Sequence, residues 1–258
     1  MDLAGRVVAV TGAARGIGRA LAEAAQARGA TIVALDRDGA GAEAVAARLG
    51  GRAYALDVAD AEAVAGTLAR IEAEIGPIAL YCSNAGILER DPDPGLATSA
   101  DPASWDRAWS VNVMGHVHAA RILVPLWLDR GGGAFLGTVS AAGLLSQIGG
   151  ATYSATKHAA LAFLEHIAIA HAADGIRVAA LCPQGVDTAM LGGASAAARD
   201  GVLSPASVAE AAFDGLALGR FLILPHPQVA DYARRRADDP ERWLAGMARL
   251  RRSMLDAR

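Results

Sequence analysis

Short apolar runs alternate with longer segments rich in Ala and Leu along most of this chain of 258 residues. Several runs lack polar alternation, which is typical of strands buried on both faces of a sheet. This alternation predicts right-handed βαβ units and the α/β class, with a doubly wound parallel sheet flanked by helices. The predicted strands are 7–10, 31–35, 53–56, 78–82, 134–139, 178–181 and 221–224. The predicted helices are 17–28, 40–49, 60–75, 102–129, 152–173 and 206–217.

No linker or change in composition divides the chain, so residues 1–258 are predicted to form a single domain. Two segments within it, 88–103 and 184–203, are too irregular for a helix or a strand. Loops of that length are usually functional lids or disordered. We expect 184–203 to be a substrate lid with a hinge at Gly192 and Gly193.

The C-terminal segment, about 227–258, is predicted to be a charged helical tail. In it Arg234 and Arg235 stand four residues before Asp238 and Asp239, a spacing that favours ion pairs along one helix face. The three consecutive arginines that end at Arg236 are therefore interpreted as a solvated face and not as an anion site.

Charge and hydropathy exclude several classes of protein. The 24 basic and 27 acidic residues give a net charge of −3, whereas a general nucleic-acid-binding protein would carry a basic excess. No uncharged apolar stretch reaches the roughly 18 residues that a membrane span needs. The first residues also lack the pattern of a signal peptide. We therefore expect a cytoplasmic protein without nucleic-acid or membrane partners.

A glycine-rich turn follows the first predicted strand and opens the first predicted helix. Its glycines are spaced Gly-x-x-x-Gly-x-Gly, and the predicted ligand contacts are Gly12, Arg15, Gly16, Ile17 and Gly18. Glycines let the backbone approach a pyrophosphate closely, and the helix start offers free N–H groups to the phosphates. In this context the turn predicts a dinucleotide site, and the alternative is an ordinary glycine-rich turn.

An acidic residue, Asp36, ends the second predicted strand. A carboxylate at this place accepts hydrogen bonds from the adenosine ribose and repels a 2′-phosphate, which favours NAD over NADP. Arg15 and Arg37 favour the opposite, because either guanidinium would pair with a 2′-phosphate. We give the carboxylate more weight and expect NAD as the cofactor, with NADP as the alternative.

Tyr153 and Lys157 are spaced i,i+4 in the helix after the fifth strand, so they share one helix face. The unperturbed pKa of tyrosine is about 10, and a nearby ammonium favours the anion and lowers that pKa. Ser140 ends the preceding strand, where its hydroxyl would hold a substrate oxygen beside the tyrosine. The alternative is an amphipathic helix with a surface lysine, but Lys157 is the only lysine of the chain.

Together these motifs resemble the short-chain dehydrogenase/reductase family over about residues 5–225. The glycine turn is similar to its cofactor loop, and Ser140, Tyr153 and Lys157 are similar to its catalytic trio. Further matches are Asp57-Val58, which looks like the adenine-contacting pair, Asn84-Ala85-Gly86 after the fourth strand, and the helix asparagine Asn112.

The resemblance implies a Rossmann-like sheet of about seven strands in the order 3-2-1-4-5-6-7. It implies that Lys157 binds the nicotinamide ribose and that Asn112 holds a water molecule that relays protons through Lys157. It also implies a homo-oligomer, either a tetramer or a dimer.

The resemblance breaks at one position after the sixth predicted strand. Pro183, Val186 and Thr188 match the family pattern, which implies that Thr188 and the Val186 backbone hold the nicotinamide carboxamide. Gln184 stands where the family usually has a glycine. Its side chain either contacts the substrate and narrows the pocket, or it points away while Gly185 supplies the flexibility.

The cysteines and histidines are expected to form neither a disulfide nor a metal site. In the implied strand order, the strands of Cys82 and Cys182 are about 9.6 Å apart, beyond the roughly 7 Å limit for a disulfide. Both thiols are therefore predicted to be reduced. His116 and His118 face different ways on a helix, and the histidines of the next helix lack i,i+3 or i,i+4 spacing.

We therefore expect an NAD-dependent dehydrogenase that acts on a small-molecule alcohol or ketone. Tyr153 is the expected general acid or base, Lys157 lowers its pKa, and Ser140 orients the substrate oxygen. A hydrophobic secondary alcohol or ketone is the expected substrate, in a pocket formed by Leu144, Gln147, Gln184, Met190 and Leu191, with Leu145 and Ile148 nearby.

Two other functions are compatible with these motifs. One is an NADP-dependent carbonyl reductase, in which Arg15 and Arg37 hold the 2′-phosphate. The other is a non-catalytic nucleotide sensor or scaffold, because a fold does not imply a function.

Overall fold

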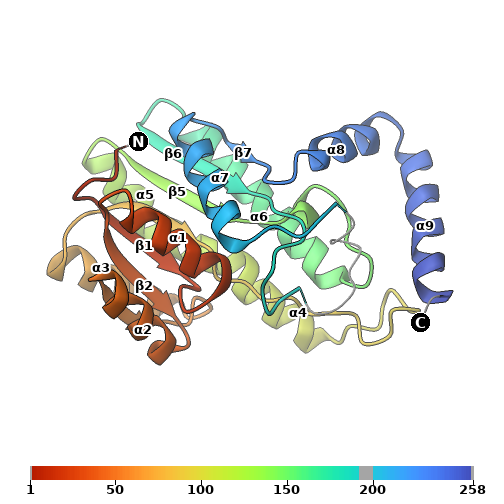
Figure 1. Cartoon of the computed structure of the whole chain (residues 1–258), viewed down its shortest axis with the longest axis horizontal. Coiled ribbons are helices and arrows are strands. Elements are labelled where there is room, and N and C mark those ends of the chain that lie inside the picture. Colours follow the sequence, from red (N-terminus) through yellow and green to blue (C-terminus); the bar gives the residue numbers. More distant parts are fainter. Residues whose placement is uncertain (1, 192–199, 257–258) are drawn as a thin grey trace.

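Seven parallel strands form the centre of the protein in a computed structural model that describes residues 2–191 and 200–256 (Figure 1). Their order across the sheet is β3-β2-β1-β4-β5-β6-β7, as predicted. The strands are β1 (Val7–Thr11), β2 (Thr31–Asp36), β3 (Arg52–Ala55), β4 (Ile78–Ser83), β5 (Gly133–Thr138), β6 (Ile176–Leu181) and β7 (Leu222–Ile223).

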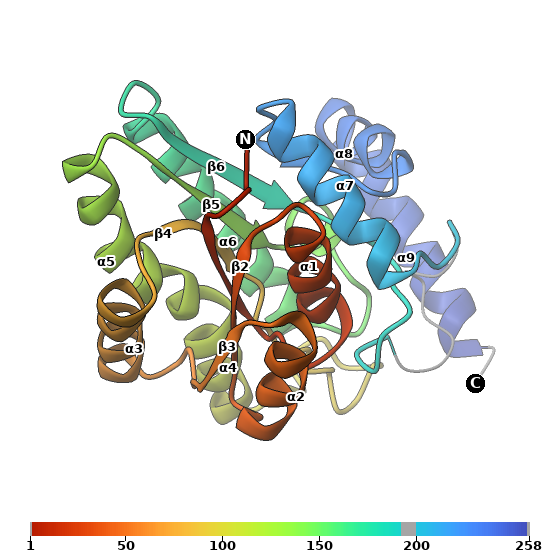
Figure 2. The same cartoon turned by 60° about the vertical axis from the view of Figure 1, so that its left-hand side comes forward.

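Helices cover both faces of the sheet, as the alternation of strands and helices predicts (Figure 2). One layer consists of α1 (Gly16–Gln26), α2 (Gly39–Leu49) and α7 (Pro205–Ala217). The other consists of α3 (Ala61–Glu74), α5 (Gly115–Asp129) and α6 (Ala151–Ala170). Each layer buries its own apolar cluster against the sheet, with Leu21 and Phe213 in one and Trp127 and Leu164 in the other.

The segment 102–129, predicted as one helix, is divided into three elements. Helix α4 (Pro102–Trp109) continues into a π-helical turn, η1 (Ser110–Met114), and then into α5. A π turn changes the hydrogen-bonding partner along the helix and often occurs at functional sites. Asn112 lies in this turn and is fully buried. The apolar periodicity of the segment gave no sign of the interruption.

The C-terminal tail is helical, as predicted, but it forms two helices, α8 (Gln228–Asp238) and α9 (Pro240–Asp256). Pro240 has no N–H to continue α8, and a proline also disfavours a helical backbone at the residue before it. Asp239 accordingly leaves the helical conformation, and its carboxylate accepts a hydrogen bond from Arg242 N at 2.9 Å. Helix α9 therefore runs in a new direction and stands apart from the sheet (Figure 1).

Strand β5 lies between the strands of the two cysteines, and both thiols are free and buried, as predicted. Within residues 2–191 and 200–256, no helix is long and apolar enough to cross a membrane.

Helix α6 approaches β5 closely at Gly137. A Cβ atom at this position would be 2.3 Å from Leu164 Cδ1, so only glycine leaves room for the leucine. Tyr153 and Lys157 lie on the same helix. The close approach of α6 to the sheet therefore fixes how far these two side chains stand from the ends of the strands.

Replacing Gly137 with Ala is expected to lower the free energy of unfolding by about 1–3 kcal/mol, the usual cost of overpacking a core. Urea denaturation measures the change. Gly66→Ala in α3 is the matched control, because a Cβ there meets nothing within 4 Å. Alanine favours a helix over glycine, so the control should gain up to about 1 kcal/mol. A loss of the same size in both variants would contradict the close contact between α6 and β5.

Candidate active site

A cavity of about 1400 Å³ opens at the carboxyl ends of the strands, next to the reversal of strand order between β1 and β4. Ligands of open α/β sheets bind at this edge. The sequence-predicted residues that line the cavity are Gly12, Arg15, Gly16, Ile17, Asp36, Arg37, Asp57, Val58, Asn84, Ala85, Gly86, Ser140, Gln147, Tyr153, Lys157, Pro183, Gln184, Val186, Thr188, Met190 and Leu191. Three others, Gly18, Asn112 and Leu144, do not line it.

The glycine turn leads directly into α1, which has no side-chain cap and no acidic residue in its first turn. By contrast, α2, α3, α4 and α7 each begin with an Asp or Ser side chain that accepts a backbone N–H. The first N–H groups of α1 are therefore available to an anion in the cavity. Gly18 serves packing, since a Cβ there would be 2.0 Å from Gly12 O. The turn thus fits a dinucleotide pyrophosphate.

Asp36 lies at the cavity wall at the end of β2, and its two carboxylate oxygens are held by the backbone. Oδ2 accepts a hydrogen bond from Ala14 N at 3.0 Å, and Oδ1 accepts one from Asp38 N at 2.9 Å. Each oxygen keeps a second lone pair for a further donor. Arg15 approaches the Asp38 carboxylate at 3.7 Å and remains largely exposed. The positive charge of Arg15, which would favour NADP, is therefore partly compensated by the Asp38 carboxylate.

Thr11 ties β1 to the end of β4 at the reversal of strand order. Its Oγ1 donates to Cys82 O at 3.3 Å and accepts from the N–H groups of Asn84 (2.9 Å) and Ala85 (3.0 Å). Asn84 Nδ2 in turn donates to Thr11 O at 3.0 Å. These bonds hold the segment Asn84–Gly86 against the cavity.

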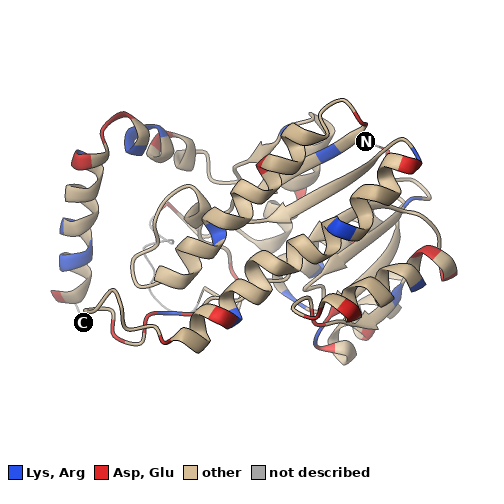
Figure 3. Cartoon of the chain, turned by 180° about the vertical axis from the view of Figure 1, so that it is seen from behind, with Lys and Arg blue, Asp and Glu red and all other residues tan. Residues whose placement is uncertain are grey.

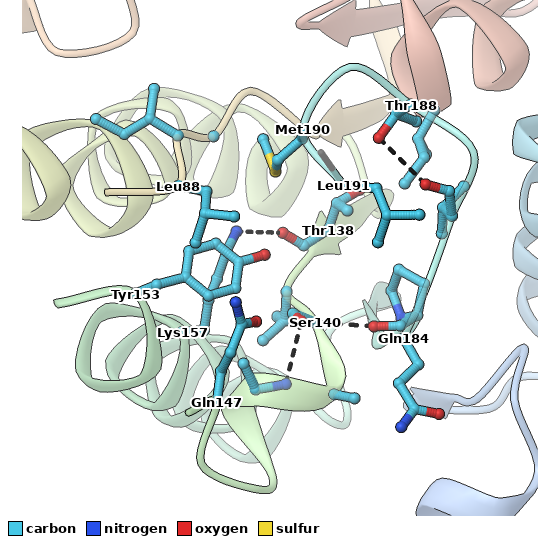
Figure 4. A pocket seen from close by; sticks show the side chains of 18 of the residues that line it. Leu88, Thr138, Ser140, Gln147, Tyr153, Lys157, Gln184, Thr188, Met190 and Leu191 are labelled. Carbon is cyan, nitrogen blue, oxygen red and sulfur yellow. Dashed lines mark hydrogen bonds between the residues drawn. The ribbon is translucent and has the colours of Figure 1, made fainter. Parts of the chain in front are cut away.

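Ser140, Tyr153 and Lys157 converge on one wall of the cavity (Figure 4). Lys157 Nζ donates to Thr138 O at 3.0 Å and lies 5.7 Å from the centre of the Tyr153 ring. Ser140 Oγ accepts from Ala142 N at 3.1 Å, which fixes its direction at the end of β5. All three side chains are buried, so their polar groups meet in a region that excludes most water.

Burial dominates the ionisation of these groups. It lowers the pKa of Lys157 to about 8 and raises the pKa of Tyr153 above its ordinary value, although a hydrogen bond from Ser140 acts to lower it. Burial of the phenolate makes the largest contribution to the pKa of Tyr153, and the expectation that the ammonium lowers this pKa stays a prediction. Tyr153 is protonated at neutral pH.

Asn112 lies behind the cavity wall and uses its amide for structure. Oδ1 accepts from Ile87 N at 2.8 Å, while Nδ2 donates to Ile87 O at 2.9 Å and to Thr156 Oγ1 at 3.1 Å. The side chain thereby joins the π turn to α6 and to the segment after β4. Its expected role in holding a water molecule stays a prediction.

Gln184 lines the cavity, and its Oε1 is buried without a hydrogen-bond partner among the described residues (Figure 4). Its backbone N–H donates to His226 Nδ1 at 3.1 Å, which positions the residue. Figure 4 shows the Gln184 side chain directed away from Tyr153, and whether it contacts a ligand stays a prediction.

Leu144 was predicted to line the pocket, and this is wrong. It follows the short 3-10 turn η2 (Ala141–Gly143), which rotates its side chain into an apolar cluster with Leu224 and Tyr232. The neighbouring residues Leu145 and Ile148 line the cavity instead.

The C-terminal helices bring residues to the cavity that were not predicted from the sequence. Tyr232 and Arg235 of α8 and Trp243, Met247 and Leu250 of α9 line it. The apolar positions of α9 recur at i, i+4 and i+7, a signal of one apolar helix face that the high charge of the tail obscured.

The predicted ion pairs of the tail are also wrong. Arg234 pairs with Asp231 at 2.8 Å instead of Asp238. Arg236 donates to Leu144 O and contacts His158 Nε2 at 3.1 Å, so it is bound to the body of the protein. Asp239 caps α9 and has no ion pair with Arg235 in the described part of the chain. The helix rotates each side chain towards a different surface, which sequence spacing alone did not resolve.

Part of the predicted lid, residues 192–199 with the expected hinge at Gly192 and Gly193, lies outside the described residues. Among the residues that are described, no group of three His, Cys, Asp or Glu side chains is placed to hold a metal ion. His116 is buried and contacts Ser83 Oγ at 2.7 Å, and burial lowers its pKa to about 3.

Comparison with known proteins gives a family match over most of the chain. A family model described as short chain dehydrogenase matches residues 6–199. The chain is 34% identical over 248 residues to the 1-deoxy-11-beta-hydroxypentalenate dehydrogenase of Streptomyces exfoliatus, covering 93% of this chain and 90% of the relative. It is 34% identical over 186 residues to the D-threitol dehydrogenase of Mycolicibacterium smegmatis, covering 70% of each.

A solved structure is similar over nearly the whole fold. It is a short chain dehydrogenase/reductase from Burkholderia phymatum in complex with NAD, with a TM-score of 0.84 and 27% sequence identity. The match covers 93% of this chain and 96% of that chain.

The single lysine gives a direct test of the buried ammonium. In protein labelled with ¹⁵Nζ-lysine, the one side-chain signal should titrate with a midpoint near pH 8, because burial lowers the pKa of Lys157 to about 8. The same signal in urea-unfolded protein should titrate near the ordinary value of about 10.4. A midpoint above about 10 in the folded protein would show that the ammonium is hydrated and contradict the described site.

Proposed function

Because this chain belongs to the short-chain dehydrogenase/reductase family, we propose that it transfers a hydride between NAD(H) and a secondary alcohol or ketone with an apolar skeleton. Enzymes of this family are NAD(P)-dependent oxidoreductases that act on CH–OH groups of small molecules. The proposal depends most on one observation: Ser140, Tyr153 and Lys157 meet at the wall of one cavity beside apolar side chains.

The cavity residues divide into groups that would hold the parts of the cofactor. The start of α1 fits the pyrophosphate, Asp36 the adenosine ribose, and Asp57 with Val58 the adenine. The residues at the nicotinamide end would be Asn84, Ala85, Gly86, Tyr153, Lys157, Pro183, Val186 and Thr188. When bound, the nicotinamide supplies or accepts the hydride.

Tyr153 is the proposed general acid and base. Its buried hydroxyl is protonated at neutral pH and gives its proton to a carbonyl oxygen in reduction. In oxidation the Tyr153 hydroxyl first loses its own proton to solvent, and the resulting phenolate, which the positive charge of Lys157 favours, takes the proton of the carbinol. Ser140 donates to the same substrate oxygen and stabilises its developing charge. Asn112 holds the π turn against α6 and thereby positions Lys157.

NAD is the proposed cofactor, because the Asp36 carboxylate faces the cavity and would repel a 2′-phosphate. The contact of Arg15 with Asp38 supports this choice. Arg37 is exposed at the same wall and favours the alternative of an NADP-dependent carbonyl reductase.

The named relatives act on different compounds and give no common substrate. The apolar skeleton of the substrate is therefore inferred from the lining of the cavity. Leu88, Met190 and Leu191 lie around the space next to Tyr153 (Figure 4), and Leu145 and Ile148 also line the cavity. Such a lining favours an apolar skeleton, with a few polar groups to orient it. Gln147 and Gln184 supply those polar groups.

A homo-oligomer is proposed from exposed apolar side chains on three helices of one sheet face. Trp105 and Trp109 lie on α4, Leu126 and Leu128 on α5, and Ile169 on α6, where it is 72% exposed. Figure 3 views the chain from behind and shows that charged residues along these long helices are sparse. An exposed apolar surface of this kind is typical of a contact between protein chains.

Tyr153→Phe is expected to lower kcat at least a hundredfold with any secondary alcohol that the wild-type protein oxidises, because the proton donor and acceptor is lost. Affinity for NADH should change less than about twofold, since the ring remains. Tyr54→Phe, which removes a hydroxyl bonded to Glu74 on the surface, is the control and should keep wild-type turnover. Retained turnover in Tyr153→Phe would show that Tyr153 is not the general acid and base.

Asp36→Ala is expected to weaken NADH binding about tenfold or more, because hydrogen bonds to a carboxylate are lost. NADPH binding should tighten, because the charge that repels its 2′-phosphate is gone. Fluorescence titration of both cofactors measures the effects, and Arg37→Ala is the partner variant. Tighter binding of NADPH than NADH by the wild-type protein, lost in Arg37→Ala, would instead support the carbonyl reductase. Binding of NADH without turnover of any alcohol would support the nucleotide sensor.

A further inference from the structure

Helix α9 forms a wall of the cavity that is separate from the sheet and its two helix layers. None of its residues is fully buried, yet Trp243, Met247 and Leu250 are partly buried on one face and line the cavity. Leu244 does not line the cavity and is 66% exposed. The apolar face of α9 is therefore directed at the same space as Tyr153, which also lines it.

Both ends of α9 are attached to the body of the protein. Near its start, the Trp243 ring lies against Tyr232 of α8, with ring centres 6.3 Å apart. Near its end, Arg251 Nη2 donates to Pro94 O at 2.7 Å and Gly95 O at 2.6 Å, in the loop after β4. The helix thus runs from α8 across to that loop, as Figure 1 shows at its far right. Between the two attachments it faces the cavity.

The three consecutive arginines of α8 have three different environments. Arg234 pairs with Asp231 on the surface, and Arg236 is bound to Leu144 O and His158. Arg235 lies between them in sequence and lines the cavity, and the described part of the chain offers it no hydrogen bond or ion pair. A guanidinium with five free donors at a cavity wall is suited to a carboxylate or a similar anion.

The other charged groups nearby already have protein partners. Arg90 Nη2 donates to Leu191 O at 2.9 Å, which directs this guanidinium to the backbone. Asp200 accepts a hydrogen bond from the Tyr232 hydroxyl at 3.0 Å. Among the described residues at this end of the cavity, Arg235 is thus the charged group whose binding capacity the protein leaves unused.

We propose that α8 and α9 form a distal subsite for the substrate, in which the apolar face of α9 covers an extended hydrophobic skeleton and Arg235 binds an anionic group at its far end. The inference rests on the proposed function, because it places the reacting carbon at Tyr153. The substrate class is then an apolar secondary alcohol or ketone that carries a carboxylate or a comparable anion remote from the reacting carbon.

The subsite explains why an apolar helix face is held open to the cavity. Trp243, Met247 and Leu250 would lose their remaining contact with water when a hydrophobic skeleton covers them, and this favours binding in proportion to the area buried. Arg235 adds discrimination, since a charge-assisted hydrogen bond depends on the anion and not on the skeleton. Size and charge of the substrate are therefore selected by different side chains.

Two fluorescent probes with the same aromatic skeleton separate these contributions. The anionic probe is 8-anilinonaphthalene-1-sulfonate, and the neutral probe is N-phenyl-1-naphthylamine, which lacks the sulfonate. Arg235→Gln should weaken binding of the sulfonate about tenfold and change binding of the neutral amine less than about twofold. Arg234→Gln, at the neighbouring arginine on the surface, is the matched control and should change neither.

A second pair of variants tests the wall itself. Met247→Ala should weaken both probes to a similar extent, because it removes apolar area that faces the cavity. Leu244→Ala truncates a side chain of the same helix that does not line the cavity and should leave both affinities unchanged. Circular dichroism and thermal melting confirm that each variant keeps the wild-type fold.

Several results would overturn the subsite. Equal weakening of both probes by Arg235→Gln, or an effect of Arg234→Gln as large as that of Arg235→Gln, would show that no anion is bound at Arg235. A change of oligomeric state in Met247→Ala with unchanged probe binding would show that α9 contacts another chain.

A titration with NADH separates this inference from the proposed function. NADH should bind Arg235→Gln and Met247→Ala as tightly as it binds the wild-type protein. If the wild-type protein binds no NADH, the proposed function fails and the probe comparison still decides the subsite. If NADH binds but the probes show no difference, the subsite alone fails.

Discussion

An ammonium group inside a protein loses most of its hydration. The structure around the cavity depends on how the protein holds the buried ammonium group of Lys157. Its Nζ is held by Thr138 O at the end of β5, and burial lowers its pKa to about 8. The helix that carries it must therefore lie close to the sheet, which Gly137 allows by leaving room for Leu164. Asn112 braces the same helix from the other side through Thr156. The position of Tyr153, four residues before the lysine, follows from these contacts.

The two ends of the cavity differ in what the protein leaves unsatisfied. At the β1–β4 end, α1 begins without a side-chain cap while Asp36 is fixed by two backbone N–H groups. This combination presents donors to a phosphate and an acceptor to a ribose. At the other end Arg235 lines the cavity, as does the apolar face of α9, and its side chain has no hydrogen bond or ion pair in the described part of the chain. The groups without protein partners thus mark the places where a ligand would supply a hydrogen-bonding partner.

The fold followed from sequence because its signals are local. A strand buried on both faces needs a continuous apolar run, a glycine turn needs its glycines at fixed places, and i,i+4 residues share a helix face. The seven strands and the convergence of Ser140, Tyr153 and Lys157 on the cavity agree with those expectations, and the strand order agrees with what the family resemblance implied. The exceptions are equally local in origin. The π turn at Asn112 and the 3-10 turn before Leu144 rotate side chains by less than a turn, which no hydrophobic period reports.

The sequence by itself determined the α/β class, the strand order implied by its motifs, and the residue types of the candidate site. Only the tertiary structure decided what the C-terminal tail does. Arg234, Arg235 and Arg236 are adjacent and chemically identical, but the helix directs them to Asp231, to the cavity and to Leu144. Which partner each side chain reaches depends on elements far away in the sequence. A chain position fixes the chemistry of a side chain, whereas packing of distant segments fixes its surroundings.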